Sequence, residues 1–242
     1  HNYTVMNNQV HSTFSTLRGQ AKTLFKTSIL LLVTLSILSN ELKSQNCVDN
    51  VDPDTWTQIP PNDYGSVGPI ALGFDYDLFG TTYTDVYINN NGNVSFDNPY
   101  AWFSSTGFPI GTPMVAPFWG DVDTRDWLAN GYQGEVWYFQ TATALYVSWI
   151  NVGTYNANDP TVDDLGNTFT LVMTDGNDDV LTPGNNTGFF YSDMQWTTGN
   201  ASNGVNGFGG IPATIGINAG DDENFILMGL YNSESEDYDG PG

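Results

Sequence analysis

The stretch TTYTDVYINNNGNVSF, residues 81–96, decides the fold. Thr81–Ile88 alternates polar residues with aromatic or β-branched residues, as a strand with one buried face does. Asn89–Asn93 then supplies the Asn and Gly residues that a hairpin turn needs, and Val94–Phe96 resumes the alternation. The stretch therefore predicts an antiparallel β-hairpin.

The same signals recur along the chain from Asn46 onward. They predict a hairpin of Glu135–Phe139 with Leu145–Val152, a strand at Thr168–Met173, and a pair of strands at Ile215–Asn218 and Phe225–Met228. We find no stretch after Asn46 with apolar residues at helical spacing over ten or more positions. We therefore expect an all-β chain, folded as a single β-sandwich-like domain of short antiparallel strands.

The first 45 residues differ from the rest in charge and hydropathy. Three basic residues precede the apolar run Thr27–Ser39, which is too short to span a bilayer and is typical of a signal peptide. We expect a signal peptide within residues 1–45, with the start of translation at Met6. The mature chain would then be secreted, extracellular or at the cell surface, and would contain no transmembrane segment. An uncleaved N-terminal anchor is the alternative interpretation.

The charge distribution excludes several function classes. The chain carries 27 acidic and 5 basic residues, a net charge of -22, and Arg125 is the one base after Lys43. Such an acidic domain repels nucleic acid and anionic membranes, and attracts cations or basic partners. Both histidines, His1 and His11, fall in the predicted signal peptide, so the mature chain lacks a histidine for a catalytic triad or a zinc site. Carboxylates are what remains for catalysis. We therefore expect no enzyme, with a carboxylate-based glycan hydrolase as the alternative.

In the stretch VAPFWGDVDTR, Val115–Arg125, an apolar run that we expect to be buried is followed by two aspartates and the lone base. Asp121, Asp123 and Asp126 offer the hard oxygen ligands that Ca²⁺ prefers, so Ca²⁺ is the one candidate cofactor. If the strand continues with period two, Asp121, Asp123 and Arg125 share a face. Arg125 would then offset the repulsion between the carboxylates, or reach a third acid across the sheet. Three interpretations stay open: an internal Arg–carboxylate clamp, an Arg125 that faces outward to hold an acidic ligand, and Ca²⁺ on the aspartates.

A second candidate surface is the loop Asn98–Phe108, which follows the first hairpin. It places Tyr100, Trp102 and Phe103 close together, and exposed aromatic residues on loops often mark binding to glycans or protein partners. The alternative is that these three side chains close one end of the sandwich and belong to the core.

Five blocks of the chain together carry a family resemblance. They are Gly73–Phe96 (GFDYDLFGTTYTDVYINNNGNVSF), Pro113–Arg125 (PMVAPFWGDVDTR), Ala144–Tyr155 (ALYVSWINVGTY), Asn167–Asp178 (NTFTLVMTDGND) and Met194–Asp221 (MQWTTGNASNGVNGFGGIPATIGINAGD). In this order they resemble the nidogen-like extracellular (NIDO) domain family. The resemblance implies a non-enzymatic extracellular module of adhesive or matrix-associated proteins, without established catalytic residues to carry over.

These observations predict four segments and a function. The segments are a leader at 1–45, a lead-in at 46–71, the nidogen-like domain at 72–230, and an acidic, Gly-rich tail or truncated continuation at 231–242. We expect an adhesion or matrix-interaction module that binds an extracellular protein or glycan and no nucleic acid. A glycan hydrolase, a lectin-like glycan-binding domain and a passive spacer within a longer surface protein are the alternatives.

Overall fold

A computed structural model of the chain describes residues 51–103, 107–125, 134–155 and 165–230. The chain separates into two units, His1–Gln45 and Asn46–Gly242. The predicted signal peptide, the tail at 231–242 and Asp126 lie outside the described residues. Within the described ranges, no helix is long and apolar enough to cross a bilayer.

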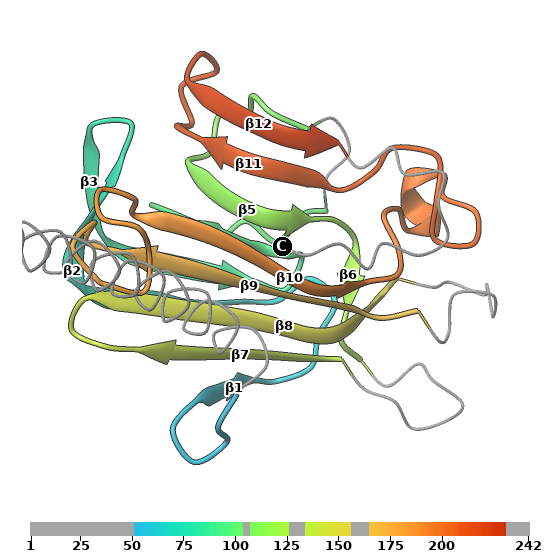
Figure 1. Cartoon of the computed structure of the whole chain (residues 1–242). Helices are drawn as coiled ribbons and strands as arrows, with labels where there is room; N and C mark the ends of the chain where they lie inside the picture. Colours follow the sequence, from blue (N-terminus) through green and yellow to red (C-terminus); the bar gives the residue numbers. More distant parts are fainter. Residues whose placement is uncertain (1–50, 104–106, 126–133, 156–164, 231–242) are drawn as a thin grey trace, which may run out of the picture. The chain divides into compact units, whose positions relative to one another are not determined.

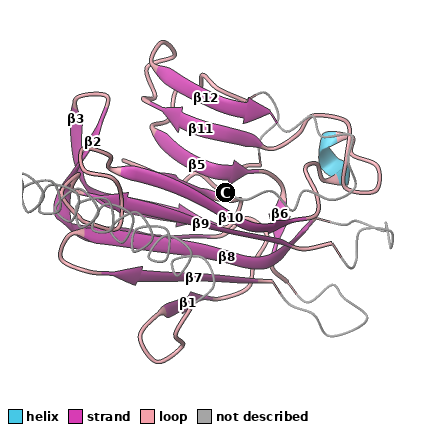
Figure 2. Cartoon of the chain, viewed as in Figure 1, coloured by secondary structure: helices cyan, strands magenta, loops and turns pink. Residues whose placement is uncertain are grey.

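The described part of the second unit consists of two antiparallel β-sheets (Figure 1). The first sheet has the strand order β1 (Thr57–Ile59), β7 (Glu135–Gln140), β8 (Ala144–Thr154), β9 (Asn167–Thr174), β10 (Thr187–Met194), with β6 (Val122–Asp123) paired to the end of β8. The second sheet has the order β12 (Phe225–Leu230), β11 (Thr214–Asn218), β5 (Met114–Trp119), β4 (Asn93–Ser95), β3 (Thr81–Asn89), β2 (Ser66–Leu78). The helical structure in the described ranges is a single 3₁₀ turn, Asn200–Ser202 (Figure 2). The predicted all-β sandwich is confirmed.

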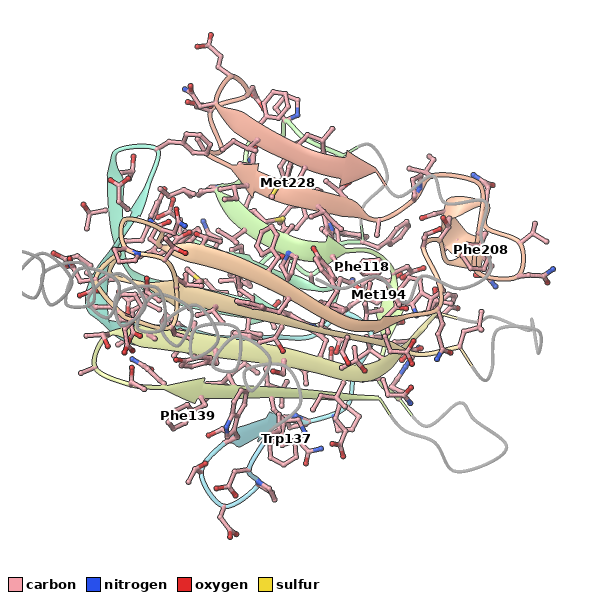
Figure 3. The ribbon with its side chains drawn as sticks, in the orientation of Figure 1. Phe118, Trp137, Phe139, Met194, Phe208 and Met228 are labelled. Atoms are coloured by element: carbon pink, nitrogen blue, oxygen red, sulfur yellow. The ribbon has the colours of Figure 1, made fainter. Side chains whose placement is uncertain are left out.

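The hydrophobic core lies between the two sheets and is centred on aromatic rings. Phe118 of β5 lies 5.3 Å from the ring of Phe169 in β9 and meets Trp196 edge-on at 5.0 Å. Phe169 in turn stacks on Trp149 of β8 at 5.1 Å. Burying each of these side chains contributes about 1.5–3 kcal/mol, and the described part of the chain, which contains no Cys, relies on this core for its stability. Figure 3 labels Phe118 of β5 and Met194 of β10, which both belong to this core, and Met228, which lies on the outer strand β12 and is exposed.

The predicted hairpins are confirmed in position and pairing. β3 pairs with β4 through Tyr87–Ser95, Ile88–Val94 and Asn89–Asn93. β7 pairs with β8, and β11 pairs with β12, as the alternation of polar and apolar residues predicts. Strand β2 begins at Ser66, so the sandwich includes residues ahead of Leu72.

The turn between β3 and β4 is buried, although it is built from asparagines and a glycine. Asn89, Asn91 and Asn93 are inaccessible to solvent and Asn90 is nearly so. Gly92 has a φ of +73°, and a β-carbon there would lie 1.9 Å from the carbonyl oxygen of Phe118. The absence of a side chain at Gly92 lets this turn pack directly against the β5 backbone. Its asparagine side chains form hydrogen bonds with the neighbouring loops.

Candidate functional site

Arg125 joins two aspartates that are far apart in the sequence. Its Nε lies 2.9 Å from Oδ1 of Asp123, and its Nη2 lies 2.7 Å from Oδ2 of the same residue. The same Nη2 also lies 2.9 Å from Oδ2 of Asp63, which belongs to the segment between β1 and β2. The Arg125 side chain is 42% exposed, while that of Asp123 is fully buried. This is the geometry of a clamp between two loops, made by bidentate, charge-assisted hydrogen bonds.

Asp121 lies outside this clamp. It is 2% exposed, and neither of its carboxylate oxygens accepts a hydrogen bond within the described part of the chain. Its backbone carbonyl, in contrast, accepts bonds from the backbone N–H of Tyr155 and from Oγ1 of Thr154, so the residue is firmly held. Burial, and after it the nearby carboxylates of Asp63 and Asp123, together raise the pKa of Asp121 to about 7.

Asp63 is the acid that the sequence did not single out. Its Oδ2 bonds Arg125, but its Oδ1 is buried without a hydrogen-bond partner among the described residues. Burial and then the carboxylate of Asp123 raise its pKa to about 6, although Arg125 acts in the opposite direction. Asp63 and Arg125 are 62 positions apart, so no local spacing could have indicated their contact.

The buried asparagine turn positions these loops. The Nδ2 of Asn90 donates to the carbonyls of Asn62 at 2.9 Å, Asp63 at 3.3 Å and Val122 at 2.7 Å, and its Oδ1 accepts from Thr124 Oγ1 at 3.0 Å. We call the carboxyl groups of Asp63, Asp121 and Asp123 the acidic cluster. The single side chain of Asn90 therefore connects both segments that carry it.

Its neighbour in the turn, Asn91, extends the same support to a third loop. The Oδ1 of Asn91 accepts from the backbone N–H of Val122 at 2.8 Å, and its Nδ2 donates to the carbonyl of Ala101 at 2.7 Å. The acidic cluster and the described start of the aromatic loop, Asn98–Phe103, are thus held by one turn, because buried polar groups of this kind cost free energy when they lose their partners.

The structure separates the three aromatic residues of that loop. The ring of Tyr100 packs edge-on against the buried Trp119 at 5.5 Å, which closes the sandwich, and Phe103 is half-buried. Trp102 is 69% exposed and meets Tyr64 edge-on at 6.2 Å, where Tyr64 is itself 45% exposed. The backbone carbonyl of Trp102 accepts a hydrogen bond of 2.8 Å from Nε1 of Trp119, so the exposed ring stands on an anchored backbone.

Tyr64 connects the aromatic pair to the acidic cluster. It follows Asp63 directly, and its pKa is raised by burial and then by the charges of Asp121 and Asp63. Both surfaces that the sequence suggested separately, the VAPFWGDVDTR stretch and the aromatic loop, therefore meet at one place. Sequence reasoning missed Tyr64 and Asp63, which lie in a segment without any periodic pattern.

The calcium-binding residues predicted from the sequence are placed differently from one another. Asp123 bonds Arg125, Asp121 has no hydrogen-bond partner within the described ranges, and Asp126 lies outside them. Across the described residues, no group of three or more His, Cys, Asp or Glu side chains is arranged to hold a metal ion. In the β11–β12 turn, Asp221 instead accepts hydrogen bonds from Asn224 and Glu223, which lower its pKa to about 2.

A surface hollow of about 440 Å³ lies at the other end of the β2–β3 hairpin. Asp77 and Asp175 are the two carboxylates among its lining residues. Each of them accepts a backbone hydrogen bond within its own turn, Asp77 from Gly80 and Asp175 from Asn177. Turn formation accounts for both carboxylates, so their presence at this hollow does not support the glycan hydrolase alternative.

The fold and the loops define a β-sandwich module that carries its exposed aromatic and acidic groups on connecting segments. The chain belongs to the nidogen-like domain family, whose model matches it in two overlapping parts, residues 84–143 and 126–239. Membership places the chain among extracellular matrix modules, a non-catalytic kind of family. The resemblance carried by the five sequence blocks is confirmed.

Two relatives illustrate the similarity. The chain is 33% identical to alpha-tectorin of Gallus gallus over 202 residues and 33% identical to alpha-tectorin of Homo sapiens over 201 residues. Each match covers 71% of this chain but 9% of the relative, so the chain spans a small part of the proteins it resembles. No solved structure matches the chain significantly.

Proposed function

We propose that this chain is a non-enzymatic adhesion and matrix-interaction module, which binds an extracellular partner protein through the surface formed by Tyr64 and Trp102. The single observation that carries the proposal is the exposed aromatic pair on an anchored backbone. Trp and Tyr are the residue types that dominate binding energy at protein interfaces, because they combine a large apolar area with few rotatable bonds.

The setting of the pair also supports a binding role. An isolated exposed aromatic residue on a mobile loop would lose conformational entropy when a partner binds. Here the loop of Trp102 is tied to Trp119 and Asn91, while Tyr64 adjoins the clamp between Asp63 and Arg125. A surface held in this way is organised before binding, and its acidic surroundings favour a partner with a basic patch.

The proposed location is secreted or at the cell surface. The apolar run Thr27–Ser39 and the preceding basic residues support export, and membership of the nidogen-like domain family agrees with an extracellular setting. The same reasoning proposes residues 1–45 as a leader that is absent from the mature module.

Binding to purified extracellular matrix proteins, measured by surface plasmon resonance, tests the proposal. The variant Trp102→Ala should weaken binding by about 30-fold, which corresponds to about 2 kcal/mol for the loss of a central aromatic anchor. Phe79→Ala is the matched control, because Phe79 is also exposed but lies at the opposite end of the β2–β3 hairpin from Tyr64. It should change affinity by less than about twofold.

Two outcomes would contradict the proposal. If Trp102→Ala and Phe79→Ala weaken binding equally, the aromatic pair is not the binding surface. If binding disappears after the partner's glycans are removed enzymatically, the lectin-like alternative replaces the protein-binding one.

A further inference from the structure

The acidic cluster carries more negative charge than its one guanidinium can balance. The carboxyl groups of Asp63, Asp121 and Asp123 lie near one another, and Arg125 bonds Asp123 and one oxygen of Asp63. The described part of the chain contains no second basic residue that could serve the remainder, because Arg125 is its one Lys or Arg. Buried ionised carboxylates without a counter-charge cost several kcal/mol, so the cluster requires a positive partner or protons.

The buried carboxylate oxygens without a hydrogen bond identify where that partner would bind. Among the described residues, the buried side-chain polar atoms that lack a partner are Oδ1 of Asp63 and both oxygens of Asp121. They belong to two residues that interact electrostatically, with Asp63 the strongest charged neighbour of Asp121. We propose that Asp63 and Asp121 together bind one divalent cation, Ca²⁺, next to the Arg125 clamp.

The donor set selects the kind of ion. All three free atoms are carboxylate oxygens, which are hard ligands that suit Ca²⁺ and not the softer transition metals. Asp123, one of the ligands suggested by the sequence, is not part of this proposed pair, because both of its oxygens already bond Arg125. Two carboxylates form a weak site, so we expect a dissociation constant of about 10⁻⁴–10⁻³ M, which is the range of extracellular calcium modules.

The position of this site relates it to the aromatic surface, although the proposal does not depend on the proposed function. Asp63 lies in the segment before β2 and directly precedes Tyr64, while Asp121 lies between β5 and β6. A cation shared by the two carboxylates therefore connects the backbone below Tyr64 to the core strand β5. Ca²⁺ binding would stabilise the same segment that Arg125 already holds through Oδ2 of Asp63.

Thermal melting of the 242-residue chain in EDTA and in CaCl₂, at equal ionic strength and pH 7.5, tests the proposal. A ligand that binds only the native state stabilises it by mass action, so Ca²⁺ at ten times its dissociation constant should raise the melting temperature by about 3–6 °C. Asp121→Asn should abolish this response. The matched control is Asp75→Asn, because Asp75 is exposed on β2 and the substitution removes the same charge; it should keep the full response.

Terbium luminescence gives a second readout that needs no variant. Tb³⁺ replaces Ca²⁺ at oxygen sites, and excitation of the adjoining Tyr64 should sensitise its emission, which CaCl₂ should then quench by competition. An equal calcium response in wild type and Asp121→Asn would place any bound ion elsewhere and overturn the proposal. Melting that is insensitive to 10 mM CaCl₂, together with terbium emission that CaCl₂ does not reduce, would also overturn it and leave the two carboxyls sharing a proton.

Discussion

Replacing Arg125 by Met tests whether the clamp stabilises the fold. Met keeps most of the length and apolar stem of Arg but removes the guanidinium and with it the side-chain hydrogen bonds to Asp123 and Asp63. The backbone hydrogen bond of 3.0 Å from Arg125 N–H to Asp123 Oδ1 can remain, so the substitution isolates the side-chain contribution.

The expected loss lies between two known limits. Removing one partner of a fully buried ion pair costs about 3–5 kcal/mol, whereas a solvent-exposed pair contributes about 0–1 kcal/mol. Arg125 is partly exposed, which screens the interaction, but both of its carboxylate partners are buried and would be left uncompensated. We expect a loss of about 2–3 kcal/mol at pH 7.5, which lowers the melting temperature by about 4–12 °C for a domain of this size.

The pH dependence of this loss provides an internal control. Arg125 lowers the pKa of Asp63, so its removal makes that carboxyl easier to protonate. Protonation removes the uncompensated charge, and the difference in unfolding free energy between wild type and Arg125→Met should therefore shrink at pH 5. Urea denaturation in EDTA at pH 7.5 and pH 5 measures both values. An unchanged stability at pH 7.5, or a loss of equal size at the two pH values, would refute the clamp.

Three further predictions follow from the same contacts. Asn90→Ala should lower the free energy of unfolding by about 3 kcal/mol, because it leaves buried carbonyls in two loops without donors. Urea denaturation measures this loss. The control is Asn177→Ala, a substitution in an exposed turn that should cost less than about 0.5 kcal/mol. Gly92→Ala should prevent folding at 37 °C, because the added β-carbon would overlap the carbonyl of Phe118. Circular dichroism would detect the loss of the sheets. A variant that melts like wild type would contradict the turn geometry. In EDTA, wild-type stability should rise as the pH falls from about 7.5 to 5, because Asp121 and Asp63 have raised pKa values of about 7 and 6 and the native state binds more protons in this window. The slope is at most about 1.4 kcal/mol per pH unit for each group, and a stability that is flat or falls on acidification would contradict the burial of the two carboxylates.

Local patterns predicted the central elements of the sandwich. The stretch Thr81–Phe96 has the alternation and the Asn–Gly turn of a hairpin, and it forms the antiparallel pair β3 and β4. The pairings of β7 with β8 and of β11 with β12 are equally local, because each turn is short. In these segments, the sequence periodicity and the tertiary burial agree.

Strand β2 escaped prediction for a physical reason. Ser66–Leu78 contains Pro69 and Gly73, and its pairing with β3 shifts register twice, between Val67 and Ile70 and between Ala71 and Tyr76. Each irregularity interrupts the period-two pattern by which a strand is recognised. The fold tolerates them because β2 is the outer strand of its sheet, where one side of the backbone needs no partner.

The candidate site shows the same division between local and long-range information. The sequence singled out Arg125, Asp121 and Asp123 because they are adjacent to a buried-looking run. Asp63 could not be found in this way, because the turn around Asn90 brings its segment to the cluster from a distant part of the chain. The buried turn itself was recognised as a hairpin turn, but its role as a support for three loops depends on packing that no local pattern reveals.

The most direct test of whether Asp63 and Asp121 bind a cation next to the Arg125 clamp is a crystal structure of the chain grown in millimolar CaCl₂. The predicted result is electron density for one Ca²⁺ with oxygens of Asp63 and Asp121 at about 2.3–2.6 Å, and Asp123 still bonded to Arg125. The contradicting result is a structure in which the Asp121 carboxyl, with no ion beside it, bonds another protein group or an ordered water.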